Sequence, residues 1–430
     1  MKEGFQGPFW VANIMELFER LAYYGQATIL SIYLRDHLKF NEMQAGQLSS
    51  IFGGLIYLLP IFAGALADKY GFRRAFAFAF LVLAIGYFLI GSTGMQLFSG
   101  FYSNFNLYWM MTFIVILTAI GGSFIKPSVL GTVALTSAPE VRSLGFAIYY
   151  WLVNMGAAIG PMIAFFVRDA YGIEFVFLVS AISCALMFIS TLAFYKEPAS
   201  RANEKRADLK VIFRNLLLVL KNKRVMPLLL IFALYWIMFW QFFIVIPFYL
   251  VDYISALSPV EIIISIGAWT ILIFQIPVNR LTKGIPTTTA IIIGFVMAVA
   301  CWLLWFLVLP ITYGVDVQIL GNTVHLSTLV IALGIIIFSL GEQTQAPRFY
   351  EYIADIAPPG QAGLFQGYAF LPVAIAWAVG GTLGGWLYKT YGISGANKPE
   401  MIFLVLMLIG VVATIAMVLY AIYVKRLAKK

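Results

Sequence analysis

Long apolar segments dominate the 430-residue chain and determine the solvent in which it can fold. A helix needs about 20 apolar residues to cross the hydrocarbon core of a bilayer. Because backbone groups in lipid must be satisfied within each segment, runs of this length favour helices over barrel strands. We therefore predict an all-α membrane protein with twelve transmembrane helices. The predicted segments are 8–34, 45–67, 75–97, 107–135, 143–168, 172–195, 226–251, 259–282, 286–311, 326–356, 361–388 and 400–424.

The low charge content excludes a water-facing globule. Only 11% of the residues are charged and the mean hydropathy is +0.92, whereas soluble domains carry about 25% charged residues. The net charge of +9 does not indicate nucleic-acid binding, because a basic groove cannot be built on so apolar a surface. Cys184 and Cys301 lie inside apolar runs, which argues against a disulfide framework or a zinc site.

The distribution of Lys and Arg predicts the orientation in the membrane. Of the 28 basic residues, 21 fall on the side that holds both termini and five on the other side. Cytoplasmic loops carry the excess of Lys and Arg, so we expect both termini to be cytoplasmic. The segment 196–225 is basic with interspersed apolar residues, which predicts an amphipathic linker lying on the cytoplasmic leaflet.

A weak fourfold repeat divides the predicted helices into triplets. Gly71, Gly172, Gly284 and Gly392 each follow the second helix of a triplet and lie 101, 112 and 108 residues apart, although a glycine after a helix is also ordinary C-cap chemistry. Because three is an odd number, successive units must be inverted in the membrane. Inverted repeats paired into two six-helix bundles, here 1–195 and 226–430, are the architecture of a secondary transporter.

Ionisable residues deep within the predicted spans are functional candidates, because each is costly in hydrocarbon unless paired or hydrated. Three of them, Glu16, Glu19 and Arg20, fall with Tyr23 on one face of the first helix. The other two are Lys126 and Glu342. A structural ion pair between the first and fourth helices is one interpretation of these charges. It leaves Glu342 without an intramembrane cation in its own half.

A ligand with both signs of charge is the other interpretation. Arg20 and Lys126 could hold a carboxylate, and Glu342 could hold an ammonium group. Protonation of Glu16 or Glu19 would free the cations from internal pairing. By linkage, substrate binding would then favour proton uptake by the same factor.

Several motifs carry a family resemblance. Residues 16–25 (ELFERLAYYG) resemble the ExxER and YYG signature of the proton-dependent oligopeptide transporter family within the major facilitator superfamily. Residues 121–128 (GGSFIKPS) and 146–156 (FAIYYWLVNMG) are similar to that family's helix 4 and helix 5 motifs. Residues 64–74 resemble the loop signature of the whole superfamily. In the second half the match is thinner, since Ala268 and Ala369 stand where the family has a binding-site asparagine and a tryptophan.

The resemblance implies the major facilitator fold and a proton-coupled symporter that imports di- or tripeptides, or similar zwitterions, by alternating access. Glu16, Glu19 and Glu342 would take part in proton coupling. The implied substrate-binding residues are Arg20, Tyr23, Tyr24, Tyr57, Lys126, Asn154, Trp236, Gln241 and Glu342. Asp68, Arg73 and Arg74, in the loop signature, would serve the conformational change. We expect no metal and no cofactor other than protons, and a monomer in the cell (inner) membrane.

Two other functions compete with this interpretation. Residues 156–161 (GAAIGP) resemble the start of a helix 5 motif of proton/drug antiporters, but Ala164 and Phe165 stand where that motif ends in two glycines. A small-xxx-small pattern is also common in membrane helix packing. Ser123 and Lys126 match the Ser-x-x-Lys of serine acyl-enzymes, a two-position pattern without a supporting motif. We therefore expect a transporter and not an enzyme.

Overall fold

The structure is a computed structural model that describes residues 4–198, 214, 221–222, 224–319, 321–356 and 368–427. α-Helices account for most of these residues. By its internal contacts the chain divides into two compact units. The first comprises Met1–Phe40 and Ile51–Arg214, and the second comprises Asn41–Ser50 and Asn215–Lys430.

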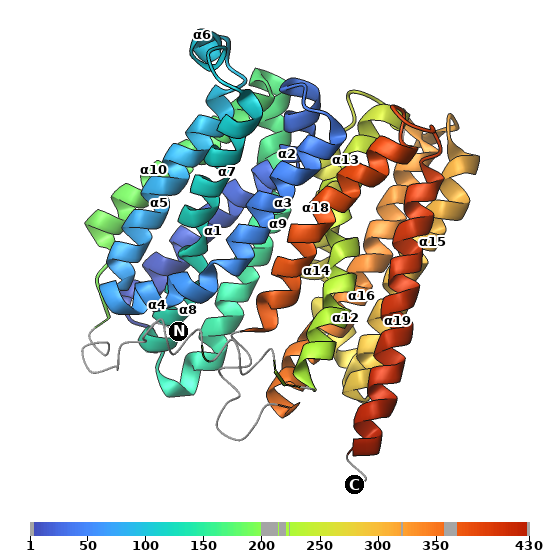
Figure 1. The fold of residues 1–430 in the computed structure, drawn as a ribbon. Helices are drawn as coiled ribbons and strands as arrows, with labels where there is room; N and C mark the ends of the chain where they lie inside the picture. The colour runs from blue at the N-terminus through green and yellow to red at the C-terminus, as the bar shows by residue number, and fades with distance from the viewer. Residues whose placement is uncertain are drawn as a thin grey trace. The chain divides into compact units, whose positions relative to one another are not determined.

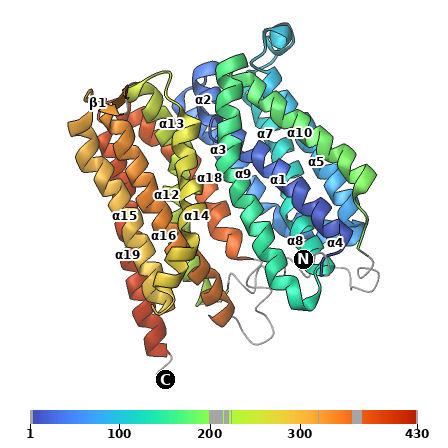
Figure 2. The same cartoon turned by 180° about the vertical axis from the view of Figure 1, so that it is seen from behind.

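The first unit is a bundle of long helices in which α1 packs against α9 and α10, while α5 packs against α7 and α10 (Figures 1 and 2). The π-helix Tyr33–His37 extends the first span, and the 3₁₀ turn Pro139–Val141 precedes α9. The helices are α1 (Gly7–Ala27), α2 (Leu30–Ile32), α3 (Glu42–Leu58, shared with the second unit), α4 (Pro60–Tyr70), α5 (Phe72–Ser92), α6 (Ser99–Tyr102), α7 (Leu107–Ser123), α8 (Ile125–Thr136), α9 (Arg142–Tyr171) and α10 (Ile173–Phe194).

In the second unit α15 packs against α16 and α19, and α12 packs against α18 and α19 (Figures 1 and 2). The helices are α12 (Val225–Trp240), α13 (Val245–Tyr249), α14 (Val260–Thr282), α15 (Thr287–Thr312), α16 (Leu326–Ile356), α18 (Leu371–Tyr391) and α19 (Glu400–Leu427). A 3₁₀ turn, Gln241–Phe243, joins α12 to α13, and a π-helix, Leu250–Ile254, follows α13. The strands β1 (Asp316–Ile319) and β2 (Asn322–His325) form an antiparallel hairpin between α15 and α16.

The helix content confirms the prediction of an all-α, multi-pass membrane protein, and the short β hairpin is an addition to it. Among the residues that the structure describes, ten helical stretches are long and apolar enough to span a membrane, or eleven if α3 and α4 are counted as one bent span. The first predicted segment, 8–34, is not among these stretches; it corresponds to α1, whose apolar run is interrupted by Glu16, Glu19 and Arg20. Most of the predicted linker 196–225, and residues 361–367 of the predicted eleventh segment, lie outside the described residues.

Two predicted spans are broken at prolines. The second span divides into α3 and α4, which begins at Pro60 and is bent by 45° from α3. The fourth divides into α7 and α8 at Phe124, three residues before Pro127. Proline lacks the backbone N–H and its ring clashes with the preceding turn, so a helix breaks or bends on its N-terminal side. The sequence prediction treated both spans as continuous.

The repeated glycines behave alike only in the first unit. Gly71 and Gly172 have φ values of 106° and 115°, a region that side chains other than glycine rarely adopt, and each is followed at once by the next long helix. Gly284 and Gly392 do not have positive φ values. The positive φ value after the second helix of a triplet is therefore found at the two glycines of the first unit and not at Gly284 or Gly392 of the second unit.

Large apolar side chains lie exposed on the helices. Trp109 is 67% exposed, Phe166 63%, Ile276 65% and Val412 58%. In water such a surface would drive association, whereas lipid chains are a suitable solvent for it. This distribution supports the assignment of the helices to a membrane.

Candidate functional site

The face of α1 predicted to be functional is buried. Glu16 and Glu19 are fully inaccessible, Tyr23 is 1% exposed and Arg20 is 4% exposed. Their spacing places them on one side of the helix, as the sequence indicates. Because an isolated charge is expensive to bury, these groups must satisfy one another.

Arg20 makes ion pairs with both glutamates of its own helix. Its Nη2 contacts Oε2 of Glu19, its Nε donates to the same oxygen at 2.5 Å, and Nε lies 3.4 Å from Oε1 of Glu16. The Arg20 Cζ atom is 4.9 Å from the ring centroid of Tyr23 and 6.0 Å from that of Tyr24. Two carboxylates and two rings therefore fix the position of the guanidinium.

Each glutamate nevertheless keeps unsatisfied oxygen atoms. Within the described part of the chain, no hydrogen bond reaches Oε1 of Glu19 or either carboxylate oxygen of Glu16. A buried carboxylate whose oxygens lack donors is a ready acceptor for a proton. The pairing with Arg20 is thus incomplete, which an ion pair of purely structural role would not require.

Lys126 brings a second cation to this cluster. It lies in the first turn of α8, directly after the break between α7 and α8, and Pro127 follows it. Its Nζ atom is 4.9 Å from the centroid of the Tyr57 ring, and it lies within electrostatic range of Arg20 and of both glutamates of α1. We call Glu16, Glu19, Arg20 and Lys126 the charged cluster.

A small pocket lies beside the charged cluster, between α1, the α3–α4 bend and the α7–α8 break. Both broken spans contribute lining residues to this pocket. Pro60 comes from the bend between α3 and α4, and Gly122 comes from the end of α7, before the break to α8. The residues that line the pocket are Arg20, Tyr23, Ile56, Tyr57, Pro60, Gly122 and Lys126.

Helix α9 supports Arg20 from behind through close backbone packing. A Cβ atom built at Gly156 would lie 2.5 Å from Cβ of Arg20, and one at Gly160 would lie 2.5 Å from the backbone oxygen of Leu21. The GxxxG pattern therefore serves helix packing, as one interpretation of the sequence held. Asn154, on the same helix, is 8% exposed and donates its side-chain N–H to the backbone oxygen of Tyr150 at 2.8 Å.

We expect Gly156→Ala to lower the free energy of unfolding by about 1–3 kcal/mol, because the added methyl group overpacks the contact between α1 and α9. The decrease would appear as a lower melting temperature of the full chain in detergent, followed by tryptophan fluorescence. Gly100→Ala is the matched control, since a Cβ atom there meets nothing within 4 Å. Equal melting temperatures for the two variants would contradict this account of the packing.

The remaining predicted binding residues belong to the second unit. Glu342 lies on α16, partly exposed, and no hydrogen bond or ion pair to its carboxylate occurs among the residues that the structure describes. Trp236 packs in an aromatic cluster, with its ring centroid 5.1 Å from that of Phe239. Gln241 is fully buried, and its amide donates to the backbone oxygens of Ile237 and Gly380 at 3.0 and 2.9 Å.

The predicted conformational residues lie at the connection between α4 and α5. Asp68, Arg73 and Arg74 are exposed there. Arg73 donates from Nη2 to the backbone oxygen of Leu192 at 2.5 Å. Glu197 accepts the backbone N–H groups of Phe72 and Arg73, each at 2.8 Å, and so caps the first turn of α5. The three residues are thus part of a surface connection and do not line the pocket.

Sequence reasoning assigned no role to Tyr87, Tyr149 or Glu261. Tyr87 of α5 is fully buried and lies within electrostatic range of Glu19 and Arg20, as Tyr149 of α9 also does. Only the tertiary structure brings these two tyrosines near the charged residues of α1. Glu261 is fully buried in the first turn of α14.

Comparison with known proteins identifies a family model and several curated relatives. The model described as Major Facilitator Superfamily matches residues 13–324. Over 191 residues the chain is 31% identical to dipeptide and tripeptide permease B of Aliivibrio fischeri. This match covers 44% of this chain and 36% of the permease. The permease B of Salmonella typhimurium is 29% identical, covering 54% of this chain and 45% of the permease. The chain therefore spans less than half the length of these two permeases.

Other matches extend over nearly the whole chain. Multidrug resistance protein MdtH of Photorhabdus laumondii is 24% identical, with 92% of this chain and 90% of that protein covered. Among solved structures, a POT family transporter in complex with 5-aminolevulinic acid has a TM-score of 0.76 at 20% identity. The matched region covers 96% of this chain and 95% of that transporter. At this identity the similarity shows a shared fold.

Proposed function

Because the chain belongs to the Major Facilitator Superfamily, we propose that it is a proton-coupled symporter for di- or tripeptides or similar zwitterions. The observation that carries the proposal is the charged cluster, in which two cations line one pocket and two incompletely satisfied carboxylates lie buried beside it. The peptide permeases among the relatives support the substrate class. The relative solved with 5-aminolevulinic acid, a small amino acid, supports the wider class of zwitterions.

The charge balance of the cluster explains the coupling. Glu16, Glu19, Arg20 and Lys126 together sum to zero when all four are ionised. A substrate carboxylate that enters the pocket would leave one excess negative charge in a medium of low dielectric constant, where such a charge is costly. Protonation of one glutamate restores neutrality. We infer that one carboxylate and one proton enter this site together.

The geometry indicates which glutamate accepts the proton. Arg20 holds Glu19 through two nitrogen atoms but approaches Glu16 only at 3.4 Å. A substrate carboxylate that takes the Nε–Nη2 edge of Arg20 therefore displaces Glu19. Once displaced, Glu19 is a buried carboxylate without a cation, and it takes up the proton. By linkage, protonation of Glu19 strengthens substrate binding to the same extent.

We propose Glu342 as a carboxylate of the second unit that can bind an ammonium group. Glu342 lies on α16, and its carboxylate forms no ion pair with a cation among the described residues. A carboxylate at membrane depth without a partner is a functional candidate. Paired with an ammonium group, it would be neutralised when substrate binds.

Export of cationic drugs by proton antiport is the second candidate. The nearly full-length similarity to a multidrug resistance protein favours it. Against it stand Arg20 and Lys126, two cations that line the same pocket and would repel a cationic drug. The excess of Lys and Arg on one side supports a chain with both termini in the cytoplasm, and we propose the cell (inner) membrane as its location.

Competition in proteoliposomes tests the proposed function. With an inward proton gradient, we expect labelled dialanine uptake to be inhibited by unlabelled dialanine, and about tenfold less well by dialanine amide or by N-acetyl-dialanine, each of which lacks one charge. Glu342→Gln should lose the discrimination against N-acetyl-dialanine but keep the discrimination against dialanine amide, because the substitution changes the proposed ammonium site and not the carboxylate site. Absence of dialanine uptake together with proton-driven export of tetraphenylphosphonium would establish the antiporter instead.

A further inference from the structure

A second cavity lies at the end of the second unit that carries the β hairpin, and it differs in chemistry from the charged cluster. It has a volume of about 260 Å³. Three parts of the chain form it: α13 with the π-helix Leu250–Ile254, the end of α15, and the connection from α18 into α19. A π-helical turn is uncommon and is frequently found at functional sites.

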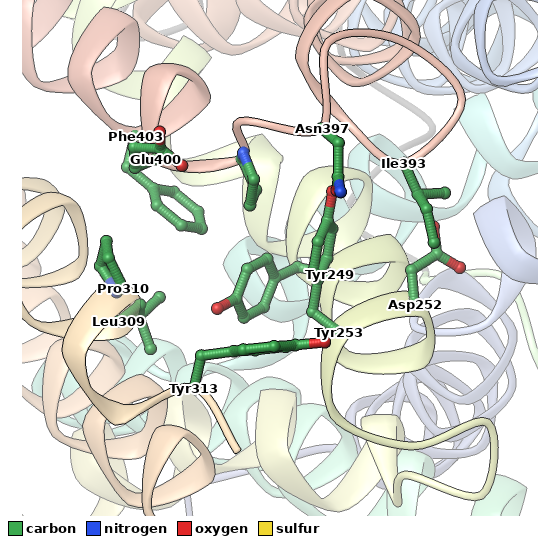
Figure 3. A pocket seen from close by; sticks show the side chains of 11 residues that line it. Tyr249, Asp252, Tyr253, Leu309, Pro310, Tyr313, Ile393, Asn397, Glu400 and Phe403 are labelled. Atoms are coloured by element: carbon green, nitrogen blue, oxygen red, sulfur yellow. The ribbon is translucent and has the colours of Figure 1, made fainter. Parts of the chain in front are cut away.

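Aromatic rings form the wall of this cavity. The Tyr249 ring stacks on that of Tyr253 at a centroid distance of 5.0 Å and meets Phe403 edge to face at 5.3 Å. Tyr313 meets Tyr253 edge to face at 6.3 Å. Figure 3 shows the rings of Tyr249, Tyr313 and Phe403 around one common space. Tyr249 and Phe403 are buried, whereas Tyr313 is 58% exposed, so the cavity has a closed floor and an open rim.

The charged groups of the lining are both acidic. Asp252 and Glu400 line the cavity, and its eleven lining residues include no Lys, Arg or His. Hydrogen bonds hold the wall in place, since Tyr388 donates to Oδ2 of Asp252 at 2.8 Å and Tyr253 donates to Oδ1 of Asn397 at 2.8 Å. Aromatic faces and carboxylates both attract cations, and neither attracts anions.

We propose that this cavity binds an organic ammonium group. The rings supply cation–π attraction to a methylated or primary ammonium, and the two carboxylates supply a negative field at the rim. An inorganic ion would be a poor fit, because most of the wall is aromatic and a small hydrated ion needs oxygen ligands. The ammonium group can belong to a free solute or to the headgroup of a lipid.

Choline binding to the purified full chain tests the proposal. We expect saturable binding in maltoside detergent, followed by calorimetry and by the melting temperature, at constant ionic strength. The uncharged analogue 3,3-dimethyl-1-butanol, which has the same shape, should not bind. Tyr313→Ala and Glu400→Gln should each weaken choline binding about fivefold. Both residues lie at the rim, so the fold is expected to survive, and an unchanged melting temperature without ligand verifies this.

Nanodiscs identify the source of the ammonium group. If choline binds less tightly in phosphatidylcholine than in phosphatidylglycerol nanodiscs, at a salt concentration that screens the anionic phosphatidylglycerol surface, the lipid headgroup competes for the cavity; equal affinities indicate a free solute. Tyr171→Ala serves as the control for loss of an exposed tyrosine, since Tyr171 is 72% exposed on α9, and it should bind choline like the wild type. Binding of the uncharged analogue as tight as that of choline, no saturable choline binding, or binding unaffected by the two rim variants would each overturn the proposal.

Discussion

Lys126→Ala is expected to reduce gradient-driven uptake of dialanine by about 100-fold. The substitution removes one of two cations that line the pocket of the first unit. It also leaves the cluster with two glutamates against Arg20 alone, so a substrate carboxylate would add negative charge to a site that is already negative. Initial rates of uptake into proteoliposomes, with an inward proton gradient, measure the effect.

The charge and the shape of Lys126 can be separated experimentally. Lys126→Arg keeps the positive charge and should retain part of the uptake, although a guanidinium does not occupy the place of an ammonium group over the Tyr57 ring without adjustment. Lys425→Ala removes an exposed lysine near the end of α19 and should transport like the wild type. If Lys126→Ala retained wild-type uptake, this lysine would have a structural role only.

Glu19→Gln is expected to uncouple transport from protons. With glutamine in place of this carboxylate, the cluster is one charge more positive and accepts a substrate carboxylate without a proton. Accumulation driven by a pH gradient should therefore fall at least about tenfold, while exchange of labelled for unlabelled substrate in counterflow continues. The pH dependence of uptake and the rate of counterflow, measured on the same proteoliposomes, test both parts of the expectation.

A surface glutamate provides the control for this second variant. Glu351 is 51% exposed and pairs with Arg348 at 2.8 Å on the same helix, so Glu351→Gln loses a carboxylate and an ion pair without touching the charged cluster. It should keep both accumulation and counterflow. If Glu19→Gln kept the pH dependence of the wild type, Glu19 would have no part in proton coupling, and Glu16 would become the residue to examine.

Much of the fold could be predicted because membrane insertion is governed by local composition. The predicted segment 172–195 corresponds closely to α10, and 286–311 to α15. The β hairpin 316–325 was missed because it is short, polar and outside the apolar pattern. The breaks at Leu59 and Phe124 were missed for another reason: prolines occur inside other helices, such as Pro161 in α9, without dividing them into two.

The candidate site likewise has features that could be predicted from the sequence and features that could not. The sequence by itself determined that Glu16, Glu19, Arg20 and Tyr23 share one face, because the periodicity of a helix is a property of neighbouring residues. Only the tertiary structure decided that Lys126 lies over Tyr57 beside this face, and that Tyr87 and Tyr149 accompany it. These contacts join side chains of separate helices, which are distant in the sequence and meet only in the folded bundle because helix packing, and not local periodicity, sets which helices are neighbours.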